Sequence, residues 1–194
     1  VPSGHGRRPR PVRRAPDRHL VLVGLPGAGK SVVGRRVARL LGRPFVDLDR
    51  AIEEAAGRTV AALFTEEGEA GFRARERAAT AALVGAPLSV IAPGGGWVLD
   101  PANPAALRPR AVIAWLRVSP ATAIARMGQG VARRPLLAGE DPVERLTAIA
   151  ARREPLYAAA ADVAFETEDL PLPHLVRRLA ALVGEPPPRT GRPA

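Results

Sequence analysis

The stretch GLPGAGKS, residues 24–31, constrains the fold of this chain more than any other segment. It follows a short apolar run at 20–24 and opens a segment of helical periodicity at 30–42. It matches the pattern G-x-x-x-x-G-K-[ST], whose glycines let backbone N–H groups close around phosphate oxygens at the positive end of a helix. We therefore predict a nucleotide-phosphate site between a buried strand and a helix; the alternative is a glycine turn before an ordinary helix.

The lysine of this motif is the only one in the chain, because the other basic residues are all arginines. Lys30 stands where a compact ammonium group must reach the β- and γ-phosphates from the start of a helix, and the broad planar fork of arginine does not replace it there. Ser31 would offer its hydroxyl to Mg²⁺. A bias toward arginine that spares this one position supports the phosphate-site interpretation.

Short apolar runs alternate with longer helical segments along the rest of the chain, and this alternation predicts an α/β fold with a parallel sheet covered on both faces. The expected helices cover 30–42, 50–86 with breaks near Gly57 and Gly68, a segment from Ser119 (N-cap) and Pro120, 141–160, and 171–183. The expected strands cover 20–24, 44–49, 88–93, 111–118 and 161–167.

Charge and composition divide the chain into one domain with two tails. The net charge is +10, of which residues 1–18 contribute +5 (six arginines, one aspartate) and residues 185–194 contribute +1 (two arginines, one glutamate), leaving +4 for the rest. We expect a disordered basic tail at 1–17, a domain at 18–184 and a disordered proline-rich tail at 185–194. Basic tails on a nearly balanced domain argue against a nucleic-acid binder.

Several classes of protein are excluded or disfavoured. The chain has no cysteine, which rules out disulfides and thiolate metal sites. No apolar run approaches the ~18 residues of a membrane span, and the basic N-terminal stretch lacks the apolar segment of a signal peptide. We therefore expect a cytoplasmic protein without a membrane partner.

Two carboxylates follow the second expected strand. Asp47 and Asp49 are two residues apart, so on a strand they would point to the same side, beyond the carboxyl ends where ligands of α/β sheets bind. One could hold a metal through water while the other binds an acceptor hydroxyl. An acidic turn that caps the next helix is the alternative.

Further polar and glycine-rich segments come later in the chain. Arg73 and Glu76 are three residues apart on an expected helix, so Glu76 could orient Arg73 toward an anion; an exposed helix pair is the alternative. The stretch PGGG, residues 93–96, would let a ligand touch the main chain, although a loop without a ligand fits equally. RRPLLAG at 133–139 could form a lid, and RREPLY at 152–157 lies late in a helix.

The motifs D-x-D, F-R-x-x-E, G-G-G, R-P-L-L and R-x-P-L-Y occur in this order over residues 19–182, and together they closely resemble the shikimate kinase family. The resemblance implies a three-layer P-loop kinase fold, similar to nucleoside-monophosphate kinases, with a five-stranded parallel sheet, an acceptor-binding segment and a lid. It implies transfer of the ATP γ-phosphate to the 3-hydroxyl of shikimate in aromatic amino-acid biosynthesis, with Mg²⁺ and as a monomer.

The same resemblance implies the site residues. The catalytic residues would be Lys30, Asp49 and Arg134. The nucleotide would contact Gly27, Ala28, Gly29, Lys30, Ser31, Val32, Arg126, Arg134 and Thr167, with Ser31 and Asp47 at the metal. Shikimate would contact Asp49, Arg73, Gly94, Gly95, Gly96 and Arg153, with Phe64 and Phe72 as walls and Glu76 steadying Arg73.

The chain departs from the family pattern around the triple glycine and in the lid. Trp97 stands where the family usually has a small residue, and we expect it to pack outside the pocket; Pro93 removes a backbone donor. The motif favours Arg134 over the adjacent Arg133 as the lid arginine. A kinase for another small carboxylated polyol, such as gluconate, is the alternative function.

Overall fold

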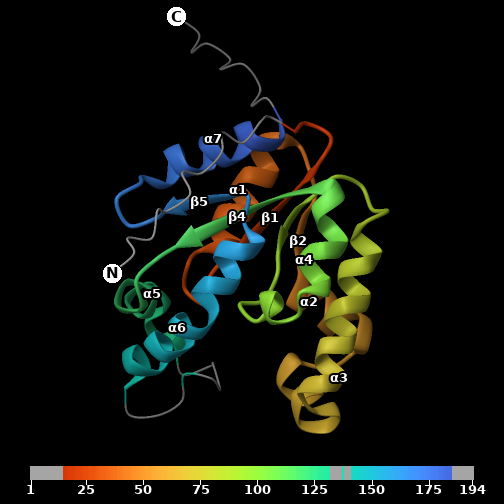
Figure 1. The fold of residues 1–194 in the computed structure, drawn as a ribbon, viewed down its shortest axis with the longest axis vertical. Coiled ribbons are helices and arrows are strands. Elements are labelled where there is room, and N and C mark those ends of the chain that lie inside the picture. The colour runs from red at the N-terminus through yellow and green to blue at the C-terminus, as the bar shows by residue number, and fades with distance from the viewer. Residues whose placement is uncertain (1–14, 132–136, 138–140, 185–194) are drawn as a thin grey trace, which may run out of the picture.

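The computed structural model describes residues 15–131, 137 and 141–184 of the chain. A five-stranded sheet runs through the middle of the molecule, with helices packed on both of its faces (Figure 1). The strands are His19–Val23 (β1), Phe45–Asp47 (β2), Val90–Ala92 (β3), Ala111–Arg117 (β4) and Val163–Glu166 (β5). The described residues thus form the α/β architecture expected from the sequence.

The α-helices connect these strands, and short 3₁₀ turns lie between them. The α-helices are Lys30–Leu41 (α1), Leu48–Ala56 (α2), Val60–Leu83 (α3), Ala102–Leu107 (α4), Pro120–Met127 (α5), Pro142–Ala160 (α6) and Leu172–Val183 (α7). The 3₁₀ turns are Trp97–Leu99 (η1), Arg108–Arg110 (η2) and Gly128–Val131 (η3). None of these helices, within the part of the chain that the structure describes, is both long and apolar enough to cross a bilayer.

The strand order is β2-β3-β1-β4-β5 and all strand pairs are parallel. Because parallel crossovers are right-handed, the connection from β1 to β2 and those from β3 to β4 and β4 to β5 run over opposite faces of the sheet. The contact between α1 and α7 places these two helices together on one face. The predicted five-stranded parallel sheet is confirmed.

The order of the strands also locates the ligand site. From the neighbouring strands β1 and β3 the chain crosses toward opposite edges of the sheet, and such a reversal opens a crevice beyond the carboxyl ends of the strands. In Figure 1, α3 lies on one side below the sheet and α5 and α6 lie on the other. The chain leaves the carboxyl ends of the neighbouring strands β1, β2 and β3 in this region.

The core is centred on β1, whose five residues are all buried. β4 is buried over its first six residues and pairs with β1 along its length, with His19 opposite Ala111 and Val23 opposite Trp115. Arg43 joins the segment before β1 to the end of α7. Its guanidinium donates to the backbone oxygens of Pro16, Arg18 and Val183 at 2.6, 2.8 and 2.7 Å.

The second strand differs from its prediction. It ends at Asp47 rather than 49, and α2 begins at Leu48. Leu48 and Ile52 are both buried and four residues apart, so helical periodicity starts at Leu48 and takes Asp49 out of the strand. The expectation that Asp47 and Asp49 share one side of a strand was therefore wrong: Asp47 precedes the helix and Asp49 lies in its first turn.

Most other boundaries agree with the prediction. The break at Gly57 ends α2, and Gly68 adopts a non-helical conformation that kinks α3. Ser119 accepts a hydrogen bond from the Thr122 amide at the start of α5. The short α4 and the flanking 3₁₀ turns, between 97 and 110, were not predicted.

Candidate functional site

A cleft of about 820 Å³ lies at the carboxyl ends of the strands. Its lining comes from four parts of the chain: residues 26–33 after β1, Asp47 and Asp49, residues 92–95 after β3, and a group at the opposite end. That last group consists of Arg126, Met127, Gly130, Thr167, Glu168, Leu170, Leu172 and Leu175. The predicted phosphate loop and the two carboxylates therefore face one space.

The loop after β1 depends on its glycines. Gly27 has φ +82°, and a Cβ atom there would lie 2.4 Å from the backbone oxygen of Ala123 in α5. Gly29, with φ +87°, immediately precedes α1. Only glycine combines this conformation with so close an approach at 27, and the backbone N–H groups that follow point out of the start of a helix.

Lys30 lies folded over this loop. Its Nζ donates to the backbone oxygens of Gly24 at 2.8 Å and Leu25 at 3.0 Å. Ala28, Gly29, Ser31 and the half-exposed Val32 complete this wall of the cleft. These two bonds hold the ammonium group against the loop that lines the cleft, where it adds a positive charge.

Ser31 and Asp47 meet across the cleft floor. The Ser31 hydroxyl donates to Asp47 Oδ2 at 2.9 Å, so the first turn of α1 is joined to the end of β2. Hydroxyl and carboxylate oxygens are hard ligands of the kind Mg²⁺ prefers. In the described part of the chain no group of three or more His, Cys, Asp or Glu side chains could hold a metal alone.

Asp49 lies two residues after Asp47, in the first turn of α2, and also lines the cleft. Burial raises the pKa of its carboxyl, and the nearby negative charge of Asp47 raises it further, against the opposing effects of Lys30 and Arg73. The helix places Asp49 beside the loop after β3. A carboxylate with a raised pKa at this position is suited to accept a proton.

The triple glycine brings three polar side chains together. A Cβ atom on Gly94 would lie 2.7 Å from Asp49 Oδ1, and one on Gly96 would lie 2.6 Å from a terminal nitrogen of Arg73. A Cβ atom on Gly95 would lie 3.4 Å from a terminal nitrogen of Arg153. Gly94 and Gly96 therefore each leave room for one charged group, Gly95 lies near Arg153, and the turn joins side chains from α2, α3 and α6.

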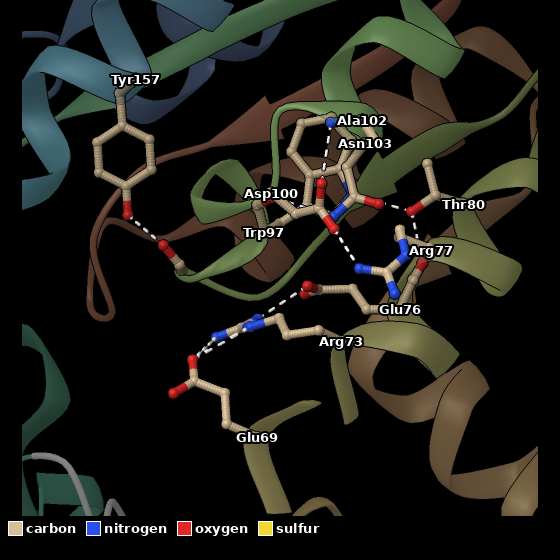
Figure 2. A network of polar contacts seen from close by, with 11 residues as sticks. Glu69, Arg73, Glu76, Arg77, Thr80, Trp97, Asp100, Ala102, Asn103 and Tyr157 are labelled. Atoms are coloured by element: carbon tan, nitrogen blue, oxygen red, sulfur yellow. Dashed lines mark hydrogen bonds and ion pairs between the residues drawn. The ribbon is translucent and has the colours of Figure 1, made fainter. Parts of the chain in front are cut away.

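Arg73 is held by two carboxylates of its own helix. Its Nη1 donates to Glu76 Oε2 at 2.8 Å and its Nη2 donates to Glu69 Oε1 at 3.2 Å (Figure 2). Burial raises the pKa of Glu76, against the effect of Arg73. The hydrogen bond between Arg73 and Glu76 confirms the predicted pairing. Because Glu76 is fully buried, the two residues do not form an exposed surface pair.

α6 supplies Arg153 and Tyr157. Arg153 is buried beside Gly95, and the Tyr157 hydroxyl donates to the Gly95 oxygen at 2.6 Å (Figure 2). Burial raises the pKa of Tyr157 to about 12, which keeps this hydroxyl protonated. The sequence singled out RREPLY for Arg153 alone and did not identify the tyrosine as a contact of the turn.

Phe64 and Phe72 stack on each other, with ring centroids 4.6 Å apart. Phe72 is buried, Phe64 is exposed, and the Arg73 guanidinium lies 5.5 Å from the Phe72 ring centre. Neither ring, nor Arg73 or Arg153, is among the residues that line the cleft. Arg73 and Arg153 lie at the glycine turn, and Phe72 lies beside Arg73 with Phe64 stacked on it.

At the opposite end of the cleft, Arg126 is fixed by Thr167. Its guanidinium donates to the Thr167 hydroxyl and backbone oxygens, both at 2.8 Å. Glu168 accepts bonds from the Ser119 amide at 2.9 Å and hydroxyl at 2.6 Å, and these bonds lower its pKa to about 2. The sequence assigned both Arg126 and Thr167 to the nucleotide without predicting their contact, and it missed Glu168, which is distant in sequence from the cap that it binds.

The lid arginine predicted at 134, and its neighbour at 133, lie outside the described residues. Trp97 is buried and is not among the residues that line the cleft, as expected, whereas Pro93 lines it.

Comparison with known proteins gives a consistent result. The sequence pattern of a family described as shikimate kinase matches residues 26–183. A shikimate kinase of Symbiobacterium thermophilum is 50% identical over 162 residues, which cover 83% of this chain and 93% of the relative. A structure of shikimate kinase from Acinetobacter baumannii in complex with shikimate superposes with a TM-score of 0.75 at 36% identity, covering 84% of this chain and 88% of the other. A gluconokinase from Sinorhizobium meliloti shares the fold, with a TM-score of 0.51 at 21% identity over 87% of this chain and 91% of the other.

Proposed function

The chain belongs to the shikimate kinase family, and from this premise we propose that it transfers the γ-phosphate of ATP to the 3-hydroxyl of shikimate. The observation that carries the proposal is the glycine turn at 94–96, where one carboxylate and two guanidinium groups meet beside the phosphate loop. A small acceptor with one carboxylate and several hydroxyls matches this set of charges.

The phosphate loop would bind the nucleotide through its backbone. Residues 27–32 line the cleft, and their N–H groups would donate to the phosphate oxygens, while Lys30, which donates to the backbone oxygens of Gly24 and Leu25 in this structure, would reach the β- and γ-phosphates. At the other end, Arg126 and Thr167 would border the adenine.

Ser31 and Asp47 fit a Mg²⁺ site. Their hydroxyl and carboxylate lie 2.9 Å apart, and they do not form a complete cage, so the ion would take its other ligands from the nucleotide and from water. When bound, the ion would neutralise charge on the transferring phosphoryl group.

The acceptor would lie between the two arginines and Asp49. Arg73 and Arg153 would bind its carboxylate, while Asp49 binds the reacting hydroxyl. The hydroxyl oxygen forms a bond to the γ-phosphorus as the bond to the β,γ-bridging oxygen breaks; ADP leaves and the hydroxyl proton passes to Asp49. Arg134, outside the described residues, is our proposed lid residue at the phosphoryl group.

All groups that we assign to ATP and to the acceptor come from one chain, so we propose that the enzyme works as a monomer. The gluconate alternative is disfavoured because the chain is 50% identical to a shikimate kinase and 36% identical to one whose structure holds shikimate. The gluconokinase similarity concerns the fold alone.

An ADP-coupled assay over shikimate, quinate, gluconate and nucleoside monophosphates tests the proposal. We expect kcat/KM for shikimate to exceed that for each other acceptor by about a hundredfold or more, because the site is built for its polar groups. Equal or faster turnover of gluconate or of a nucleotide would contradict it.

A further inference from the structure

Trp97 closes the glycine turn and has no part in the mechanism above. Its backbone N–H donates to the Gly94 oxygen at 3.1 Å, which makes 94–97 a four-residue turn. Trp97 is 1% exposed and is not among the residues that line the cleft. The question is whether the indole only fills space or also sets the position of the turn.

The indole is tied to the helix that carries Arg73. Its Nε1–H donates to the Thr80 hydroxyl at 3.0 Å, and that hydroxyl donates to the backbone oxygen of Glu76 at 2.7 Å (Figure 2). Glu76 in turn binds Arg73 through its carboxylate. A continuous chain of contacts therefore leads from the end of the turn to the guanidinium beside Gly96.

Two further bonds leave the turn little freedom. The Trp97 oxygen accepts from Asn103 Nδ2 at 3.1 Å, which joins the turn to α4, and Tyr157 holds the Gly95 oxygen from α6. The Trp97–Thr80 bond joins the turn itself to α3, and the Arg77–Asp100 ion pair joins the same helix to the residue that follows η1. The closeness of Arg73 to Gly96, with 2.6 Å to an added Cβ, shows how small a displacement would alter this geometry.

The burial of Thr80 supports a polar rather than a space-filling role. Thr80 is fully buried, and a buried hydroxyl destabilises the fold unless it is hydrogen-bonded. Here the hydroxyl uses both its donor and its acceptor capacity, toward Glu76 and Trp97. An aromatic ring without an N–H would fill the same space but leave that acceptor unused.

We propose that Trp97 and Thr80 are positioning residues for acceptor recognition: their hydrogen bond sets the distance between the glycine turn and Arg73. The proposal rests on the proposed function, in which Arg73 binds the acceptor carboxylate. It makes Trp97, a departure from the usual small residue, part of the acceptor site without contact to the acceptor.

The principal test is Thr80→Val, which keeps the shape of the side chain and removes the hydroxyl. We expect KM for shikimate to rise about three- to tenfold, with KM for ATP and kcat within about twofold, because the two neutral hydrogen bonds of this hydroxyl are lost at the acceptor end alone. Thr80→Ser should restore KM for shikimate, since it keeps the hydroxyl.

Thr147→Val is the matched control. The Thr147 hydroxyl donates to the Val143 oxygen at 2.8 Å, the same contact four residues back in a helix, but Thr147 is exposed and no indole binds it in the described structure. We expect this variant to leave both KM values unchanged. Urea unfolding of each variant measures the general loss of stability.

Trp97→Phe and the double variant complete the cycle. Both single changes break the same Trp97–Thr80 bond, so the double variant should raise KM for shikimate by less than the product of the single effects. Equal changes in the two KM values, unchanged KM for shikimate in Thr80→Val, failure of Thr80→Ser to restore it, or independent effects would each overturn the inference. If the unaltered chain neither binds nor phosphorylates shikimate, the proposed function fails and the inference with it; the other outcomes leave the proposed function intact.

Discussion

The two ends of the cleft are built in different ways. The phosphate end comes from one continuous stretch, residues 24–31, in which backbone groups and a single ammonium face the ligand. The acceptor end is assembled from α2, α3, the loop after β3 and α6, and its contacts are made by charged side chains packed against glycines. One end depends on local conformation and the other on long-range packing.

This difference predicts different sensitivities. Among substitutions only proline removes a backbone donor, so most side-chain changes would affect the phosphate end mainly at Lys30, its one charged side chain. Each acceptor group depends on others, such as Arg73 on Glu76, so damage there spreads between residues and should affect shikimate rather than ATP. Substitutions at the two ends should therefore separate in their effects on the two KM values.

Lys30→Ala should have the largest effect, a fall in kcat of about 10³-fold or more, because it removes the positive charge that meets the transferring phosphate. Lys30→Arg should restore little, since the guanidinium does not fit a site for a compact ammonium. Single-turnover kinetics measure the loss. Activity close to that of the unaltered enzyme, with an unchanged melting temperature, would refute the assignment of the phosphate end.

Asp49→Asn should lower kcat about 10²- to 10³-fold because an amide cannot accept the proton, while ATP binding stays intact. Burial raises the pKa of Asp49, so in the unaltered enzyme the carboxyl gains its proton at a higher pH than an ordinary aspartate does. We therefore expect kcat to fall on acidification through this raised pKa, and the variant to lack that acid limb. An unchanged acid limb in Asp49→Asn would assign the titration to another group.

Substitution of the two acceptor arginines tests whether they share one ligand. Arg73→Ala and Arg153→Ala should each lower kcat/KM for shikimate by a factor equivalent to about 2 to 3 kcal/mol of transition-state stabilisation, with little effect on KM for ATP. The free-energy loss in the double variant should be smaller than the sum of the two single losses. Shikimate titrations at saturating ATP measure this. Strictly additive losses would place the two guanidinium groups at separate sites.

Glu168→Gln should give the smallest effect, and it should change KM for ATP rather than KM for shikimate. Glu168 accepts two bonds from Ser119 and lines the far end of the cleft, so its charge loss should raise KM for ATP about two- to fivefold and leave KM for shikimate unchanged. Ser119→Ala should act in the same direction. A larger change in KM for shikimate than in KM for ATP would break the division between the two ends.

The same contrast between local conformation and long-range packing explains which parts of the fold and the site could be predicted from the sequence. The phosphate loop was predictable because its glycines, Lys30 and Ser31 are contiguous and each has a local physical reason. The parallel sheet followed from the alternation of apolar runs and helical segments. Asp49 was wrongly predicted on a strand because the short segment 44–49 fits both the alternation of a strand and the start of a helix. Only the burial of Leu48 and Ile52 in the core shows that the helix begins at Leu48.

The acceptor contacts were predictable only as separate motifs. That Gly94, Gly95 and Gly96 each lie against a different charged group is a property of three dimensions, as is the bond between Trp97 and Thr80, which are 17 residues apart. Glu168 and Ser119 are 49 residues apart and share no pattern. Sequence patterns identify the participants, and packing decides how they meet.

The glycine turn has a consequence for inhibition and for resistance to it. Every amino-acid replacement at Gly94 or Gly96 adds a Cβ atom, and at both positions that atom would overlap a charged side chain. A replacement at either position that weakened the binding of an inhibitor to this turn would therefore also displace Asp49 or Arg73. Resistance by this route would carry a cost at the enzyme's own acceptor site, which makes the backbone at Gly94 and Gly96 a suitable place for the closest contacts of a designed compound.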